Sequence, residues 1–142
     1  MTRHPDYPSS PTGSLTAAIL LQEVAILRRR SGERDEARRL YADVLARLNE
    51  PDHPGHAEAR LQTRFALSNL LHDEGRTRQV LHAERENLTE VTAAVRRGVL
   101  DEERLAFAAY RTGQAAMDWG DFTCAVEAGE IAVRTYLRLT EA

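Results

Sequence analysis

Glycine recurs along this chain at a nearly constant spacing. Gly32 and Gly75 are 43 residues apart, and Gly75 and Gly120 are 45 apart. A second series, Gly55 and Gly98, repeats the interval of 43 residues. Glycine adopts positive φ angles at little steric cost, so it is typical of tight turns. Two interleaved series with one period predict a repeated unit of helix, tight turn, helix and looser turn.

The segments between these glycines favour helix. They are rich in Ala, Leu, Arg and Glu, and none shows the two-residue alternation of a strand. Ser14, Asp101 and Asp121 are positioned as N-caps. The sequence therefore predicts an all-α fold, with helices over residues 15–30, 33–48, 56–74, 77–97, 101–119 and 121–139.

The length of 142 residues corresponds to one domain. Pro5, Pro8 and Pro11 lie among Ser and Thr residues that offer little apolar surface to bury. We therefore expect a disordered leader over residues 1–13 and a folded helical repeat domain over residues 14–142.

Composition excludes several classes of protein. The formal net charge is −3, with all 19 basic residues being Arg, which argues against a strongly basic nucleic-acid binder. No apolar run approaches the ~20 residues of a membrane span, and the N-terminus lacks the apolar core of a signal peptide. The single cysteine, Cys124, cannot form an internal disulfide, so we expect a cytoplasmic protein without membrane association.

Small residues follow the turn glycines in register. The third unit is the clearest, with Gly113, Gly120, Ala125 and Ala132, and the first unit has Ala37 and Tyr41 after Gly32. These positions resemble the tetratricopeptide repeat, and the long period resembles its kinesin-light-chain variant. The resemblance covers about residues 15–139. It implies a right-handed α-α superhelix of about three helix-turn-helix repeats, in a bacterial regulatory or assembly partner.

The resemblance also implies a concave groove that binds a protein or peptide and performs no chemistry. Aromatic side chains would supply apolar contact, amides would bond a peptide backbone, and Arg would hold a carboxylate. The first helix of each repeat would line this groove. The candidate groove residues are Gln22, Arg29, Phe65, Asn69, His72, Phe107, Tyr110, Arg111 and Gln114.

Alternatives to this assignment stay open. Phe65 and Phe107 are also compatible with ordinary packing between adjacent helices. Family members that clamp the acidic tail of chaperones use five residues, of which only Arg111 is matched here, so that role is disfavoured. The groove could instead sense a peptide or small-molecule effector. An enzyme built on a helical solenoid is the third alternative, with His72, Asp73, Tyr110 and Arg111 as its polar cluster.

Other polar groups give no strong functional motif. The run Arg28-Arg29-Arg30 is followed by interleaved acidic residues, which is typical of a solvated helix face. His53 and His56 lack the spacing of a metal site, and His53 fits a turn-stabilising role in the segment PDHP. Cys124 fits a buried structural thiol. We expect no metal, no cofactor and no enzymatic activity.

The segment 121–139 carries two apolar stripes. One stripe, from Phe122 to Tyr136, is expected to pack on the preceding helix. A helix with a second apolar stripe needs a second neighbour. We therefore expect that second stripe to form an interface, either with a symmetry-related copy in a homodimer or with a partner protein. Its residues are Cys124, Ala128, Ile131, Thr135 and Leu139.

Overall fold

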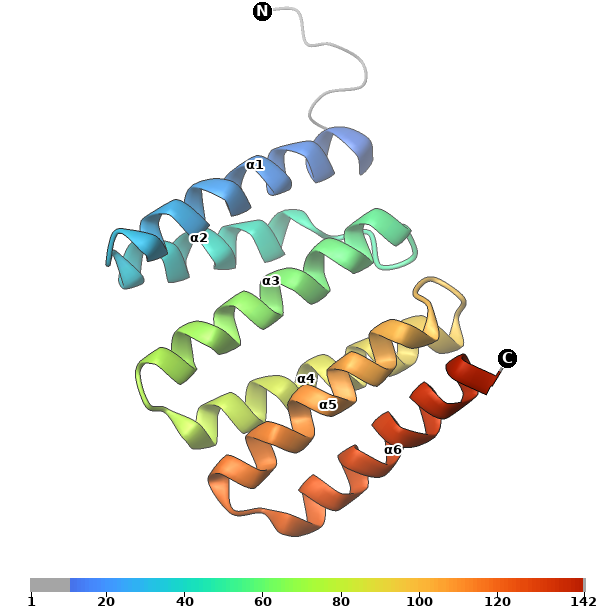
Figure 1. Cartoon of the computed structure of the whole chain (residues 1–142). Helices are drawn as coiled ribbons and strands as arrows, with labels where there is room; N and C mark the ends of the chain where they lie inside the picture. The colour runs from blue at the N-terminus through green and yellow to red at the C-terminus, as the bar shows by residue number, and fades with distance from the viewer. Residues whose placement is uncertain (1–10, 142) are drawn as a thin grey trace, which may run out of the picture. The chain divides into compact units, whose positions relative to one another are not determined.

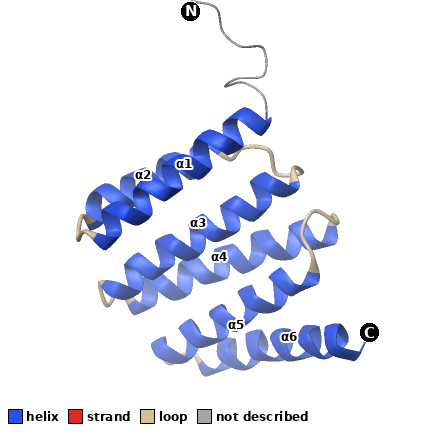
Figure 2. Ribbon diagram, turned by 45° about the horizontal axis from the view of Figure 1, so that its top comes forward, coloured by secondary structure: helices blue, strands red, loops and turns tan. Residues whose placement is uncertain are grey.

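A computed structural model describes residues 11–141 of the chain, and within that range it contains helices and connecting turns but no strand. Figures 1 and 2 show these helices joined by short loops. The all-α prediction is confirmed, and each predicted helix exists with ends displaced by a few residues. The helices are α1 (Pro11–Arg30), α2 (Arg34–Arg47), α3 (Pro54–Asp73), α4 (Thr77–Arg96), α5 (Glu102–Trp119) and α6 (Phe122–Glu141).

The start of α1 differs most from the prediction. The helix begins at Pro11, where a proline fits because the first helical N–H has no partner to lose. Ser14 is therefore not an N-cap but lies inside the helix, with its hydroxyl 3.4 Å from Nε2 of His56. The leader predicted over residues 1–13 is wrong for residues 11–13, and the rest of it lies outside the described residues.

The turn glycines act as predicted at four positions. Gly32, Gly75, Gly98 and Gly120 all have φ between +72° and +94°, in the left-handed region. Gly55 is the exception, because it lies in the first turn of α3. A Cβ at Gly55 would come within 2.6 Å of a Leu15 methyl group, so close approach between helices accounts for this glycine.

Three helix starts are fixed by side chains that sequence analysis singled out. Asp101 accepts a hydrogen bond from the N–H of Arg104 at 3.3 Å, and Asp121 accepts one from the N–H of Cys124 at 3.1 Å. Both N-cap predictions are confirmed. Nδ1 of His53 accepts the N–H groups of Gly55 and His56, which gives His53 the turn-stabilising role expected of it.

The described residues divide into two compact units, and residues 11–70 belong to the first. Here α1, α2 and most of α3 pack through large side chains. Tyr41 is 1% exposed and lies with Ala25, Ala37 and Leu70. A second cluster joins Val44 and Leu48 to smaller residues, and Arg60 donates to the carbonyls of Leu45 and Leu48.

The second unit, residues 71–142, contains α4, α5 and α6. Its core is built from smaller residues. Val80 and Leu81 of α4 pack against Ala115 and Ala116 of α5, with Cys124 at the edge. The side of α5 that faces its neighbours is almost entirely alanine, which lets the helix axes approach closely. Its buried residues are Ala106, Ala108, Ala109, Thr112, Ala115 and Ala116.

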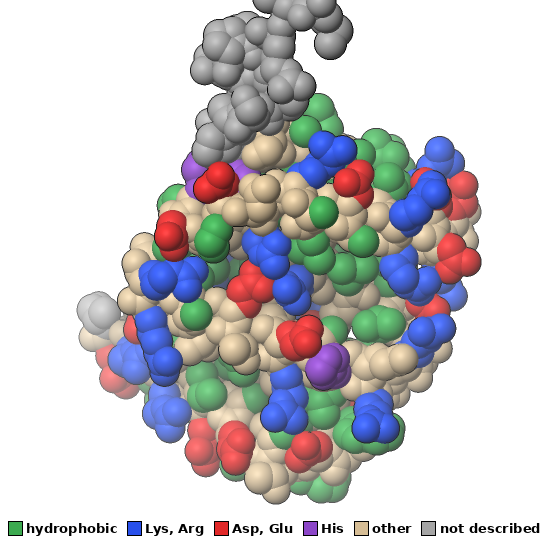
Figure 3. Space-filling view, turned by 180° about the vertical axis from the view of Figure 1, so that it is seen from behind, with side chains coloured by type: hydrophobic (Ala, Val, Ile, Leu, Met, Phe, Trp, Pro, Cys, Tyr) green, Lys and Arg blue, Asp and Glu red, His purple; other side chains and the backbone are tan. Residues whose placement is uncertain are grey.

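The charged groups on the surface are of mixed sign. In Figure 3, acidic and basic side chains alternate across the face that is shown. Arg28 pairs with Glu33, Arg38 with Asp35, and Arg39 with Glu36. The arginine-rich segment is therefore a solvated face with neighbouring counter-charges, as expected.

Among the described residues, no helix combines the length and the apolar character needed to cross a membrane.

Candidate functional site

The outer face of α5 carries large side chains that its inner face lacks. Phe107 is 42% exposed, Tyr110 is 51% exposed and Met117 is 54% exposed. Together with Gln114 they recur at steps of three and four residues, which places them on one side of the helix. We call Phe107, Tyr110, Gln114 and Met117 the α5 stripe. The rings of Phe107 and Tyr110 stack with their centroids 6.4 Å apart, which provides a preformed aromatic platform.

An ion pair supports α5 beside this stripe. Nε of Arg111 lies 2.8 Å from Oε2 of Glu84, and a second guanidinium nitrogen lies 3.2 Å from Oε1. The Glu84 side chain is only 3% exposed, so this carboxylate depends on its cationic partner. The Thr112 hydroxyl also bonds the backbone carbonyl of Glu84, at 3.2 Å. These contacts fix the rotation of α5 on α4 and hence the direction of the α5 stripe.

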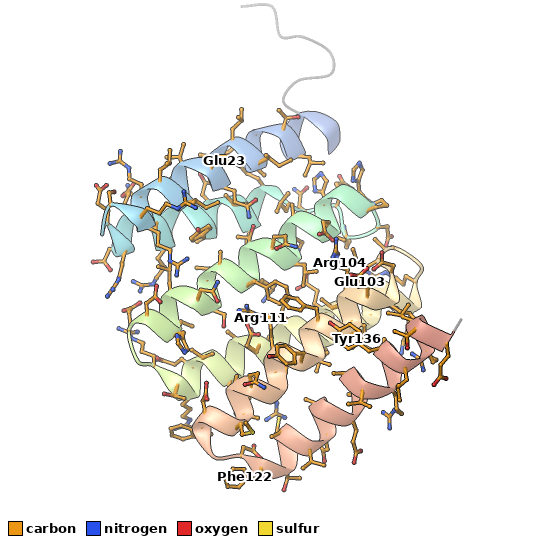
Figure 4. The ribbon with its side chains drawn as sticks, in the orientation of Figure 1. Glu23, Glu103, Arg104, Arg111, Phe122 and Tyr136 are labelled. Atoms are coloured by element: carbon orange, nitrogen blue, oxygen red, sulfur yellow. The ribbon has the colours of Figure 1, made fainter. Side chains whose placement is uncertain are left out.

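The role predicted for Arg111 therefore changes. The sequence predicts that Arg111 holds a ligand carboxylate, but its guanidinium makes two contacts with Glu84 (Figure 4 labels Arg111). The physical reason is the burial of Glu84, which sequence analysis did not place beside Arg111. A charged residue among the buried positions of α4, which include Val80, Val91 and Ala94, was the available signal. The 27-residue separation from Arg111 hid the partner.

The other predicted groove residues divide between the two units. In residues 1–70, Phe65 is 6% exposed, which agrees with the alternative of helix packing, while Gln22, Arg29 and Asn69 are half-buried. In residues 71–142, His72 is exposed near the end of α3. The structure thus groups Phe107, Tyr110, Arg111 and Gln114 on α5.

The assignment of the two stripes on α6 is wrong for most of their residues. The residues predicted to form the interface face the rest of the unit: Ala128 is 3% exposed, Thr135 is 2% exposed, and Cys124 and Ile131 are half-buried. Only Leu139 of that set, at 41%, is exposed. The stripe predicted to pack on α5 is divided: Ala125 and Ala132 face the core, whereas its large members are exposed, namely Phe122, Val126, Val133 and Tyr136. The reason is residue size, since Ala128 and Thr135 allow the close approach to α5 that Phe122 and Val126 would block.

Neither Cys124 nor the histidines of the described residues form an activated nucleophile or a metal site. Burial raises the pKa of the Cys124 thiol, a nearby Arg85 opposes that shift, and Asp121 and Glu127 add to it. The thiol is therefore held in its less nucleophilic form. His56 is fully buried and lies near Ser14 and the N–H of Glu50. Within residues 11–141, no cluster of three or more His, Cys, Asp or Glu residues could hold a metal ion.

A comparison with protein-family models, curated proteins and solved structures finds no match for this chain.

Proposed function

We propose that this chain is a tetratricopeptide-like repeat protein that serves as a protein- or peptide-binding adaptor. The observation that carries the proposal is the α5 stripe. Helix α5 turns alanines toward its own unit and presents Phe107, Tyr110 and Met117 to solvent. A helix stabilised by packing alone normally has the opposite distribution, with its large apolar residues inside.

The stripe has the chemistry of a binding surface. Aromatic side chains dominate the energetics of protein interfaces, and methionine adapts to irregular partners. Gln114 adds an amide that can bond a peptide backbone. The expected ligand is therefore an apolar peptide segment with exposed backbone groups, such as a helix or an extended strand.

The glycine turns are the second support. The positive-φ residues Gly32 and Gly120 close the α1–α2 and α5–α6 hairpins, and Gly75 lies in the turn that follows α3, at the spacing that the resemblance rests on. In such arrays each repeat presents a side of its first helix to ligands. Helix α5 occupies that place in the third hairpin, between Gly98 and Gly120.

The rival functions differ in what they need. An effector sensor would hold a small molecule on the same stripe, and an enzyme would need a general base within hydrogen-bond reach of its orienting partner. The Glu84–Arg111 pair does not meet that need, because both groups neutralise each other. We therefore favour the adaptor role.

Affinity capture from the native host tests this proposal. Wild type is compared with the double variant Phe107→Ala/Tyr110→Ala and with Gln79→Ala, a control at an exposed position of α4. We expect at least one protein to be retained by wild type and by Gln79→Ala but not by the double variant. With the purified partner, loss of two anchors should weaken binding by about 30-fold or more.

The proposal is wrong if every captured protein is retained equally by the double variant. Native mass spectrometry of the purified chain separates the effector alternative. A small molecule carried by wild type and absent from the double variant would favour effector sensing over an adaptor.

A further inference from the structure

Helix α6 has its own exposed apolar stripe, distinct from the α5 stripe. Phe122 is 68% exposed, Val126 is 59%, Val133 is 58% and Tyr136 is 39%. With Gly129 and Thr140 they recur at steps of four and three residues along one side of the helix. We call this set the α6 stripe. Figure 4 labels Phe122 and Tyr136, which lie near its two ends.

A hollow lies in the middle of the α6 stripe. It is an open depression of about 530 Å³ lined by Val126, Gly129, Glu130, Val133 and Arg134. Gly129 makes the hollow, because a Cβ built there would meet nothing within 4 Å. Glycine is a poor residue for a helix interior, and no packing within the described chain requires it at this position. By contrast, a Cβ at Gly113 would lie 3.6–3.8 Å from α6 atoms, where α5 and α6 pack.

The positions of the α6 stripe are evenly spaced on either side of Ile131, and each pair of equidistant positions joins a larger and a smaller side chain. Phe122 and Thr140, Val126 and Tyr136, and Gly129 and Val133 are each equidistant from that residue. Two copies of α6 packed antiparallel about a two-fold axis at this level would pair each residue with its counterpart. Val133 of each copy would then enter the hollow at Gly129 of the other, and the ring of Tyr136 would cover Val126.

The charges beside the stripe agree with this pairing. Glu130 and Arg134 border the same hollow, and in the part of the chain that the structure describes no ion pair engages either of them. In the antiparallel arrangement Glu130 of one copy lies about 3 Å along the axis from Arg134 of the other. The two-fold axis generates two such attractive Glu130–Arg134 contacts. They outnumber the single repulsive contact between the two Glu130 residues.

We propose that the chain forms a two-fold homodimer in which the α6 stripe packs antiparallel against itself, with Val133 of each copy seated on Gly129 of the other. The observations select a second copy as the occupant because size and charge complement themselves across one axis. This inference does not rest on the proposed function, since it uses a different helix face.

Sedimentation velocity over a range of concentrations is the first test. Wild type should sediment as a dimer at tens of micromolar, and Gly129→Arg should be monomeric at the same concentrations. Glu127→Arg, an exposed position outside the stripe, is the matched control and should leave the dimer intact. Circular dichroism shows that each variant is folded. A monomeric wild type at 100 micromolar, or a Gly129→Arg variant that still forms the dimer, overturns the proposal.

Charge exchange tests whether the occupant is a second copy. Glu130→Arg and Arg134→Glu should each raise the dimer dissociation constant about tenfold, and the double exchange should restore it to within about threefold. The double exchange restores binding only if the same chain supplies both sides of the contact, because a partner of different sequence keeps its original charges. Failure of the double variant to recover would contradict the pairing.

Disulfide trapping tests the antiparallel register, in a Cys124→Ala background. Glu130→Cys lies next to the proposed axis and should cross-link to its own copy under mild oxidation. Thr123→Cys lies about 12 Å along the helix from the level of Ile131, and thus about 24 Å from its copy, so it should not. Equal cross-linking at both positions would indicate parallel helices and overturn the arrangement.

Discussion

The two compact units are stabilised by side chains of different size. Residues 1–70 bury Tyr41, Leu48 and Leu61 almost completely, whereas the most buried positions of α5 and α6 are mainly alanine and threonine. The exposed apolar residues show the opposite trend. Among the described residues of the first unit the exposed large apolar side chains lie on α1, and in the second unit they extend along both α5 and α6. Large side chains thus build the core of the first unit, which exposes apolar residues on one helix, whereas the second unit packs α5 and α6 through small residues and exposes large apolar side chains on both.

The largest difference in stability is expected between alanine variants of two tyrosines, one in each unit. Tyr41→Ala empties a site that is 1% exposed and should destabilise the fold by about 3–5 kcal/mol. Tyr110→Ala removes a ring that is half exposed and should cost about 1 kcal/mol or less. Chemical denaturation of both variants measures the difference. Similar losses for the two would remove the contrast between the units.

The ion pair of the second unit gives the next largest effect. Arg111→Ala leaves the buried Glu84 carboxylate without its partner and should cost about 3 kcal/mol. A residue that only held a ligand carboxylate, the role that the sequence predicts for Arg111, would leave stability unchanged when removed. Arg78→Ala, at an exposed position of α4, is the control. A melting temperature for Arg111→Ala equal to wild type would show that the pair contributes little.

Larger side chains at the buried alanines of α5 should also lower the stability of the fold. Ala116 is fully buried between α4 and α5, so Ala116→Leu must displace Val80 or Leu81 and should destabilise by about 1–3 kcal/mol. Met117→Leu, one position along the helix and 54% exposed, should change stability by less than about 0.5 kcal/mol. Toleration of the leucine at both positions would mean that α5 is loosely packed.

A substitution at Gly129 should change stability by a smaller amount, and should raise it. Gly129→Ala places a methyl group in open space and improves helix propensity, so the isolated protomer should gain about 1 kcal/mol. The measurement is thermal unfolding of dilute protein, where any dimer is dissociated. A loss of stability would show that the glycine is needed inside the protomer.

The smallest effect concerns pH. Burial raises the pKa of the Tyr41 phenol, although Arg29 acts in the other direction. The folded state therefore holds this proton more tightly than the unfolded chain does. The stability gained is fully present below the ordinary tyrosine pKa of about 10 and is lost as pH rises through the higher folded value. Tyr41→Phe should show a weaker decline in stability above pH 10 than wild type.

Local signals made the fold largely predictable from sequence. Gly32, Gly75 and Gly120 mark turns because only glycine takes their backbone angles cheaply, and Asp101 and Asp121 mark helix starts because their carboxylates cap the first turn. Gly55 does not mark a turn of this kind, because the glycine is required there by close contact with Leu15 of another helix. Such a contact depends on tertiary packing, which the local sequence does not contain.

The candidate site was less predictable, for the same reason. Tyr110 and Gln114 were found by helical spacing, but the engagement of Arg111 depended on Glu84 of another helix. On α6 both stripes have helical period, so periodicity alone could not choose between them. The deciding factor was side-chain volume at the crossing with α5, where Gly113 faces Ala125 and Ala128.

The alanine-lined side of α5 has a consequence for how this protein can diversify. The positions that hold the helix in place and the positions of the α5 stripe are separate sets, one of small residues and one of large residues. If the α5 stripe binds a ligand as proposed, substitutions at Phe107, Tyr110 or Met117 would change what it recognises while the fold is left intact. Selection for new specificity and selection for foldability would then act on α5 independently, and descendants of this chain could acquire new ligands by single replacements.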